Sequence, residues 1–108
     1  MEKIKTKGFS AKDEFNSAGA TPIKMAKNSI IRVTDLMIKD KLPDEDGKVE
    51  TVGHLKAEDG TIYATISSTV IEQLVALIDI LDTDGPQDVL IVPKTSNGGR
   101  EYFMLELQ

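Results

Sequence analysis

The order of apolar and polar residues predicts a long, bent strand at the start of the patterned part of the chain. In the segment Asn28–Lys39, Ile31 and Val33 share one face, and the parity then switches to Leu36 and Ile38. A change of parity inside one strand is typical of a β-bulge or a sharp bend. We therefore expect the first strand to bend at Thr34-Asp35.

Two further strands, 49–57 and 61–67, flank Asp59-Gly60, a dipeptide that strongly favours tight hairpin turns. A polar turn, 42–48, precedes them. If Asp59-Gly60 forms a two-residue turn, Lys56 lies opposite Tyr63, and His54 joins them on one exposed face. The apolar residues of both strands then share the buried face: Leu55, Ala57, Ile62, Ala64 and Ile66.

The segment Ser68–Leu81 has the spacing of an amphipathic helix. Thr69 followed by Glu72 has the pattern of a capping box, and no Gly or Pro interrupts the segment. The predicted buried stripe consists of Ile71, Leu74, Val75, Ile78 and Leu81.

Two more strands, 88–95 and 100–107, follow around a turn at 96–99. Period-two alternation places Phe103, Leu105 and Leu107 on one face of the last strand. The opposite, outward face carries Arg100, Tyr102, Met104 and Glu106.

The predicted order of three strands, one helix and two strands indicates an all-β fold with one helix, an OB-fold-like five-stranded barrel (β-β-β-α-β-β). In this arrangement the bent first strand pairs in both halves of the barrel, and the helix closes one open end. Two alternatives are an α+β sheet with a helix across its face and a small sandwich that gains a strand from the N-terminal segment.

Charge divides the chain into two regions. The full sequence has 108 residues and a net charge of -5, but residues 1–27 carry six lysines against three acids, whereas 28–108 carry seven basic residues against fifteen acids. We interpret 1–27 as a basic N-terminal arm, partly extended with a strand near Ile4, and 28–108 as the OB-like barrel domain. Such an arm suits phosphate, an acidic partner or a neighbouring subunit.

The composition excludes several classes of protein. The chain has no cysteine, so it has no disulfide, thiolate metal site or cysteine nucleophile. No apolar run approaches the ~20 residues of a membrane span, and no signal peptide is recognisable. We expect a cytoplasmic protein, in the host cell cytoplasm if it is phage-encoded, with no membrane association.

Catalytic residues are scarce. His54 is the one histidine, the acidic run Asp44-Glu45-Asp46 lacks the spacing of a calcium loop, and the turn 96–99 lacks the lysine and helix of a phosphate loop. We therefore predict a protein that is not an enzyme and that needs no metal and no cofactor.

Single-stranded nucleic acid requires aromatic rings for base stacking and cations for phosphates. OB-folds place these groups around their second and third strands and the neighbouring loops. The predicted binding residues are the outward-facing Tyr63, Tyr102, Lys56, His54, Arg32 and Arg100. The acids lie mainly in turns and on the outer side of the helix, away from these residues. Because the net charge is nevertheless -5, we expect modest, salt-sensitive binding.

The stretch GHLKAEDGTIYATISSTVIEQLVAL, together with the closing TSNGGREYFMLEL, resembles the small single-stranded DNA-binding proteins of bacteriophages with an OB-like fold. The resemblance covers about residues 28–108. It implies non-catalytic coating of single-stranded DNA in phage replication or recombination, as a homodimer or larger homo-oligomer that works with replication or recombination proteins. Many such proteins end in a flexible acidic tail, whereas a predicted apolar strand ends this chain.

Two hypotheses about function follow. The first is sequence-tolerant binding of single-stranded DNA by aromatic stacking and phosphate contacts. The second is a non-catalytic protein-interaction or assembly module that uses the sheet face or the basic arm.

Overall fold

The computed structural model describes residues 2–40 and 45–108, and the side chains of residues 8–40 and 45–108. Residues 42–44 of the predicted turn 42–48, which include Asp44 of the acidic run, therefore lie outside the described residues. The elements in chain order are β1 (Glu2–Lys7), α1 (Ala11–Asn16), the 3₁₀ helix η1 (Ser17–Gly19), β2 (Thr21–Pro22), the 3₁₀ helix η2 (Ile23–Ala26), β3 (Ile30–Asp40), β4 (Thr51–Ala57), β5 (Ile62–Thr65), α2 (Ser68–Asp84), β6 (Gln87–Thr95) and β7 (Glu101–Leu107).

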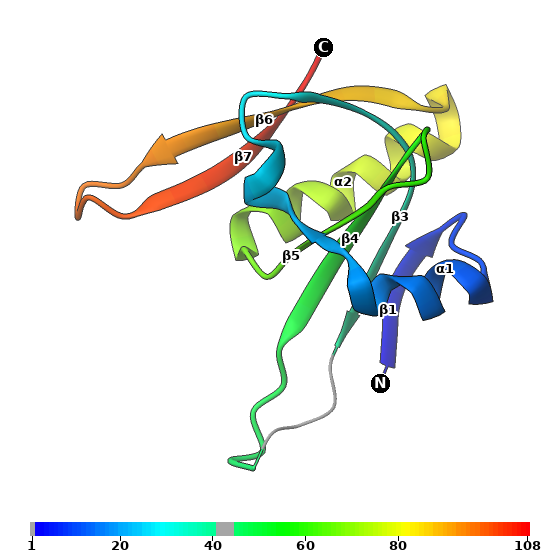
Figure 1. Ribbon diagram of the computed structural model, residues 1–108, viewed down its shortest axis with the longest axis horizontal. Coiled ribbons are helices and arrows are strands. Elements are labelled where there is room, and N and C mark those ends of the chain that lie inside the picture. The colour runs from blue at the N-terminus through cyan, green and yellow to red at the C-terminus, as the bar shows by residue number, and fades with distance from the viewer. Residues whose placement is uncertain (1, 41–44) are drawn as a thin grey trace.

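A single curled sheet organises the molecule, with strands in the order β2-β5-β4-β3-β6-β7 and with β1 paired to β3 beside this path (Figure 1). The five predicted strands correspond to β3, β4, β5, β6 and β7. The predicted strand count is wrong, because residues 2–7 and 21–22 also join the sheet. The predicted strand near Ile4 is confirmed as β1. The division of the chain at residue 28 stays a prediction.

The bend in β3 lets this strand serve two halves of the sheet. Its first part, Ile30–Val33, pairs with β6, and its second part pairs with β4 on one edge and β1 on the other. The register shifts between Val33 and Asp35, so the predicted bulge at Thr34-Asp35 is confirmed.

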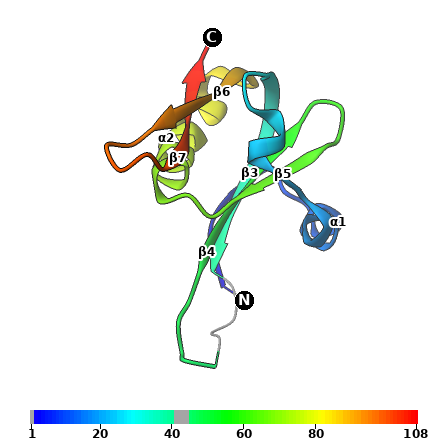
Figure 2. The ribbon, with the colours of Figure 1, turned by 60° about the vertical axis from the view of Figure 1, so that its left-hand side comes forward.

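The sheet forms a curled half-barrel, consistent with an OB-like all-β fold (Figure 2). Strands β2 and β7 stand at the two ends of the strand order, so the barrel is open between them. The hairpin β6–β7 and helix α1 lie at opposite sides of the molecule.

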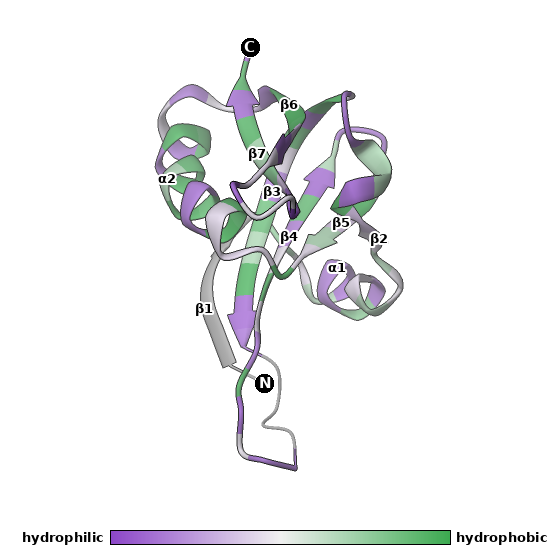
Figure 3. Ribbon diagram, turned by 90° about the vertical axis from the view of Figure 1, so that its left-hand side faces the viewer, coloured by the Kyte–Doolittle hydropathy of each residue, from purple (hydrophilic) through white to green (hydrophobic). Residues whose placement is uncertain are grey.

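Helix α2 fills the inner side of the curl, and α1 lies on the other side of the central strands (Figure 3). The α2 residues in the core are Val70, Leu74, Leu77, Ile78 and Leu81. This stripe is rotated from the predicted one, since Val75 is 37% exposed and Ile71 is only half-buried. Both stripes satisfy the 3.6-residue period, so spacing alone could not separate them.

The helix α2 also begins and ends differently from the prediction. Its N-cap is Ser67, whose hydroxyl accepts a hydrogen bond from the Val70 N–H at 3.4 Å, so Thr69 lies inside the first turn. The helix continues to Asp84, where Gly85 ends it with a φ of 78°. No helix among the described residues is long and apolar enough to cross a membrane.

The hairpin β4–β5 has a register one residue away from the predicted one. Its loop has three residues, Glu58-Asp59-Gly60, because Ala57 N–H donates to the Thr61 carbonyl and Gly60 N–H donates to the Ala57 carbonyl. Gly60 adopts the left-handed φ of 92° that the third residue of such a loop requires. As a result Lys56 lies opposite Ile62, and Leu55 lies opposite Tyr63. A shift by one residue exchanges the faces of the second strand relative to the first.

Gln73 connects α2 to the open edge of the sheet. Its side-chain amide donates to the Leu105 carbonyl at 2.8 Å and accepts from the Leu105 N–H at 2.7 Å. The amide thereby takes the place of a neighbouring strand for one residue of β7. These two hydrogen bonds attach β7 to α2 at the open side of the half-barrel.

Replacing Gln73 with leucine is expected to lower the free energy of unfolding by about 1–3 kcal/mol, because two hydrogen bonds are lost and the backbone groups of Leu105 are left without partners. Urea denaturation measures this change. The Glu72→Leu variant alters the exposed neighbour on the same helix and serves as the control. Equal stability of the Gln73 variant and the wild type would contradict the contact.

Candidate nucleic-acid interface

The outward face of β4 and β5, where the sequence places His54, Lys56 and Tyr63 together, is covered by the segment that contains α1. His54 is only 4% exposed, and its ring centre lies 6.4 Å from that of Phe9. Tyr63 lies on the opposite face and packs against the main core. The prediction that these three side chains share one exposed face is therefore wrong, because the register differs and residues 8–20 cover the face.

Lys56 is paired with α1 rather than open to solvent. Its Nζ lies 2.9 Å from a carboxylate oxygen of Asp13. Asp13 also forms a capping box with Ser10 at the start of α1, through two hydrogen bonds of 3.1 Å. The spacing of Ser10 and Asp13 was a local signal for this short helix, which the sequence analysis did not use.

These contacts change the acidity of both partners. The hydrogen bond from Lys56, followed by that from the Ser10 backbone, lowers the pKa of Asp13. The hydrogen bond to Asp13 raises the pKa of Lys56. The attachment of α1 to the sheet is thus strongest when both groups are charged, as they are at neutral pH.

We expect the attachment of α1 to weaken in acid. A carboxyl group whose pKa is lowered on folding stabilises the fold above its ordinary value of 3.8, and this contribution is lost as the pH falls through the lowered value. The difference in unfolding free energy between the wild type and Asp13→Asn should therefore be largest near neutral pH and shrink below pH 3.8. Urea denaturation at a series of pH values checks this, with Asp79→Asn as an exposed control. A difference that does not change with pH would contradict the pairing.

Arg32 and Tyr63 meet in a hollow of about 360 Å³ beside the β4–β5 turn. Arg32 forms ion pairs with Glu58 at 3.6 Å and Asp88 at 3.3 Å. Asp59 also lines the hollow. This acidic surrounding is unfavourable for phosphate, although each exposed ion pair is weak.

A larger hollow, of about 730 Å³, is an open groove between the start of β7 and the segments on the far side of the open barrel. We call it the β7 groove. It is lined by residues of three segments: Pro22, Ile23 and Lys24; Ala64, Thr65, Ile66, Ser67, Ser68 and Thr69; and Arg100, Glu101, Tyr102 and Phe103. The structure therefore brings Arg100 and Tyr102 together, and it separates them from His54 and Lys56.

The faces of β7 match the prediction in part, since Phe103 and Leu105 pack against the main core and Tyr102 and Met104 do not, whereas Leu107, predicted on the inner face, is 45% exposed. Tyr102 lies directly opposite Lys94. Lys94 was not among the residues predicted from sequence, because a four-residue turn at 96–99 would pair Tyr102 with Pro93, whereas the observed register is centred on Gly98 and pairs it with Lys94.

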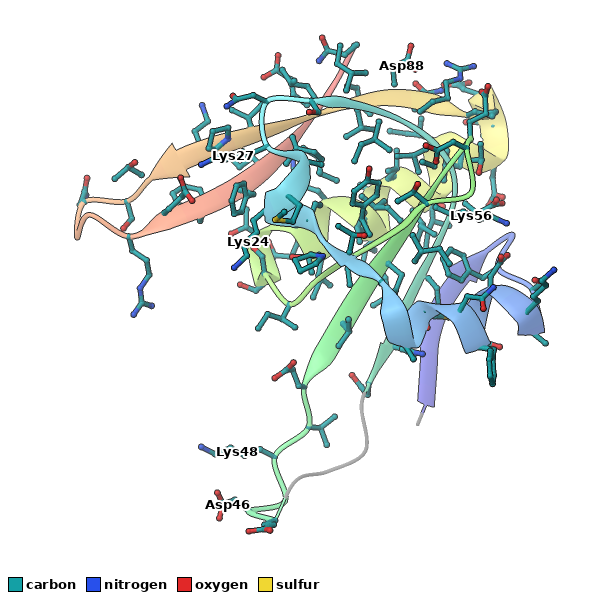
Figure 4. All side chains as sticks on the ribbon, in the orientation of Figure 1. Lys24, Lys27, Asp46, Lys48, Lys56 and Asp88 are labelled. Carbon is teal, nitrogen blue, oxygen red and sulfur yellow. The ribbon has the colours of Figure 1, made fainter. Side chains whose placement is uncertain are left out.

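Four exposed cations near this side of the molecule make no ion pair with any residue that the structure describes: Lys24, Lys27, Lys94 and Arg100. Figure 4 shows Lys24 and Lys27 on the side of the β6–β7 hairpin, and Lys56 on the far side near α1. These four cations lie on the side of the β7 groove, whereas Lys56 on the face of β4 and β5 is paired with Asp13. In residues 2–40 and 45–108, no cluster of acidic or histidine side chains could hold a metal ion.

Comparisons with known proteins agree with a nucleic-acid ligand. The family model described as "Phage Single-stranded DNA-binding protein" matches residues 3–108. The single-stranded DNA-binding proteins of Bacillus phage PZA and Bacillus phage phi29 are each 39% identical over 64 residues, which cover 57% of this chain and 52% of the relative. The chain thus spans about half the length of the curated relatives that it matches. No solved structure matches the chain.

Proposed function

This chain belongs to the phage single-stranded DNA-binding protein family, and from this premise we propose that it binds single-stranded DNA in the β7 groove without sequence preference. The family consists of binding proteins and not of enzymes. We place this activity in phage DNA replication or recombination, where single strands are exposed.

The observation that carries the proposal is the meeting of Arg100, Tyr102 and Lys24 around one open groove. A ring for base stacking and cations for phosphates are the two requirements of sequence-tolerant binding. Tyr102 is half-buried, so its position is fixed while one side of the side chain stays accessible. Lys94 lies across the strand pair from it and adds a cation.

The proposal keeps Tyr102 and Arg100 of the residues predicted from sequence and leaves out the other four. His54 is buried, and Lys56 is paired with Asp13. Tyr63 and Arg32 share a hollow with acidic side chains. The cations Lys24, Lys27 and Lys94 replace them in the proposed site.

Local charge also reconciles an acidic protein with an anionic ligand. The net charge is -5, yet the β7 groove itself holds Lys24 and Arg100 against Glu101 alone. If all four exposed cations contact phosphates, the logarithm of the binding constant should fall with the logarithm of salt concentration with a slope of about −3.

Fluorescence anisotropy of labelled oligo-dT, with a duplex of the same length as competitor, tests the proposal. We expect the protein to bind oligo-dT at low salt and to bind it more weakly as the salt concentration rises. The duplex should compete poorly with oligo-dT. A folded protein that fails to bind oligo-dT at low salt would refute the proposal. That result would favour the alternative, a non-catalytic protein-interaction or assembly module.

A further inference from the structure

Phe15 on α1 has no role in the packing of the fold. It is 84% exposed, the largest exposed fraction among the bulky apolar side chains that the structure describes. Asp13 of the same short helix and Ser17 of η1, which follows it, are both buried against the sheet. The opposite side of α1 thus presents an uncovered aromatic ring to solvent.

A hollow of about 340 Å³ lies beside this helix, between α1, η1 and the strands β3, β4 and β5. Its lining includes Ser17, Ala18, Lys39 and Ala64. Lys39 Nζ lies 3.3 Å from the Ser17 hydroxyl oxygen, so this cation is positioned at the C-terminal end of α1. We call this hollow the α1 hollow.

The α1 hollow and the β7 groove meet at Ala64, which lines both of them. The segment η1–β2–η2 follows α1 in the chain, and its strand β2 pairs with β5 at Tyr63 and Ala64. A strand of DNA that leaves the groove over Ala64 therefore reaches the α1 hollow without crossing the core. The side chains of Ala20 and Ala64, which line the α1 hollow at this point, are small.

The charges at α1 suit the same ligand. Lys12 is exposed three positions before Phe15, and Lys39 lines the α1 hollow. Glu14 is the one acid among the residues that line it. These three side chains sum to +1, which is complementary to a phosphate backbone.

We propose that the single-stranded DNA path continues from the β7 groove over Ala64 to α1, where Phe15 stacks on a base and Lys12 and Lys39 contact phosphates. This inference rests on the proposed function, because it extends the path of the same ligand. Short oligonucleotides fill the β7 groove alone, and only longer ones reach Phe15. Phe15 is therefore a length-dependent binding residue.

The test measures the affinity of wild type, Phe15→Ala and Phe15→Tyr for oligo-dT of about 4 and about 16 nucleotides, the limits of the site sizes known for OB-type domains. Phe15→Ala should bind the longer oligonucleotide about 5- to 100-fold more weakly and the shorter one as the wild type does. Phe15→Tyr keeps the ring and should restore the affinity. Val75→Ala on α2, which also truncates an exposed apolar side chain, should leave the affinity for both oligonucleotides unchanged.

Three results would overturn the inference. If the wild type binds both lengths and Phe15→Ala changes neither, Phe15 lies off the path while the proposed function stands. Equal losses for both lengths would place Phe15 in the primary site and refute the two-part path. A change of mass in solution by light scattering, with unchanged DNA affinity, would assign Phe15 to self-association instead. If the wild type binds neither length, the proposed function itself fails.

Discussion

Replacing Tyr102 with alanine is expected to weaken the binding of oligo-dT by about 5- to 100-fold, because a stacked base contributes about 1–3 kcal/mol. The side chain lies on the outward face of β7, opposite Lys94 and outside the main core, so the fold should persist. Anisotropy titrations with labelled oligo-dT measure the loss. Circular dichroism shows that the variant is folded.

Two variants make this result specific to stacking. Tyr102→Phe keeps the ring and should retain most of the affinity. Met104→Ala truncates the next side chain on the same face, outside the β7 groove, and should bind like the wild type. If Tyr102→Ala binds as tightly as the wild type, the bases do not stack on this ring, and the site must be sought elsewhere on the sheet.

Replacing Leu74 with alanine is expected to lower the free energy of unfolding by about 2–5 kcal/mol, because the side chain is fully buried and its loss leaves a cavity. Leu74 is 0% exposed and lies at the centre of the contact between α2 and the sheet. A loss of this size is a large part of the ~5–15 kcal/mol that stabilises a small domain. Val75→Ala, one residue further, should change stability by less than about 0.5 kcal/mol.

Gly53 provides a second check of the same contact. A Cβ added at Gly53 would lie 2.6 Å from Leu74 Cδ1, so α2 packs directly on the backbone of β4. Gly53→Ala should lower the free energy of unfolding of the wild type. The loss should be smaller in the Leu74→Ala background, because the leucine side chain that the new methyl group would meet is absent there. Urea denaturation of the four proteins measures this coupling. Equal costs in both backgrounds would contradict the close approach.

Local patterns predicted the elements of the fold well. The parity change at Thr34-Asp35 indicated the bulge in β3, and the alternation of the last strand placed Tyr102 on its outward face. Both features depend on residues within one strand. The hairpin β4–β5 was more difficult, because Asp59-Gly60 is compatible with a two-residue turn and with the last two residues of a three-residue loop.

The site could be predicted only in part, because its residues come from distant parts of the chain. The ion pair between Asp13 and Lys56 joins positions 43 residues apart, and no local pattern indicates that α1 covers β4. The β7 groove likewise combines Lys24 with Arg100 across the open side of the half-barrel. Charge counting identified the basic N-terminal segment, but only the tertiary structure shows which of its lysines stand beside an accessible ring.

The most direct test of DNA stacking in the β7 groove uses the two tyrosines of a chain that has no tryptophan. In Tyr63→Phe, Tyr102 is the single source of tyrosine emission, and titration with oligo-dT at low salt should quench it strongly. In Tyr102→Phe, the same titration should leave the emission of Tyr63 almost unchanged. Unquenched Tyr102 emission under conditions in which anisotropy shows bound DNA would contradict the assignment of the β7 groove.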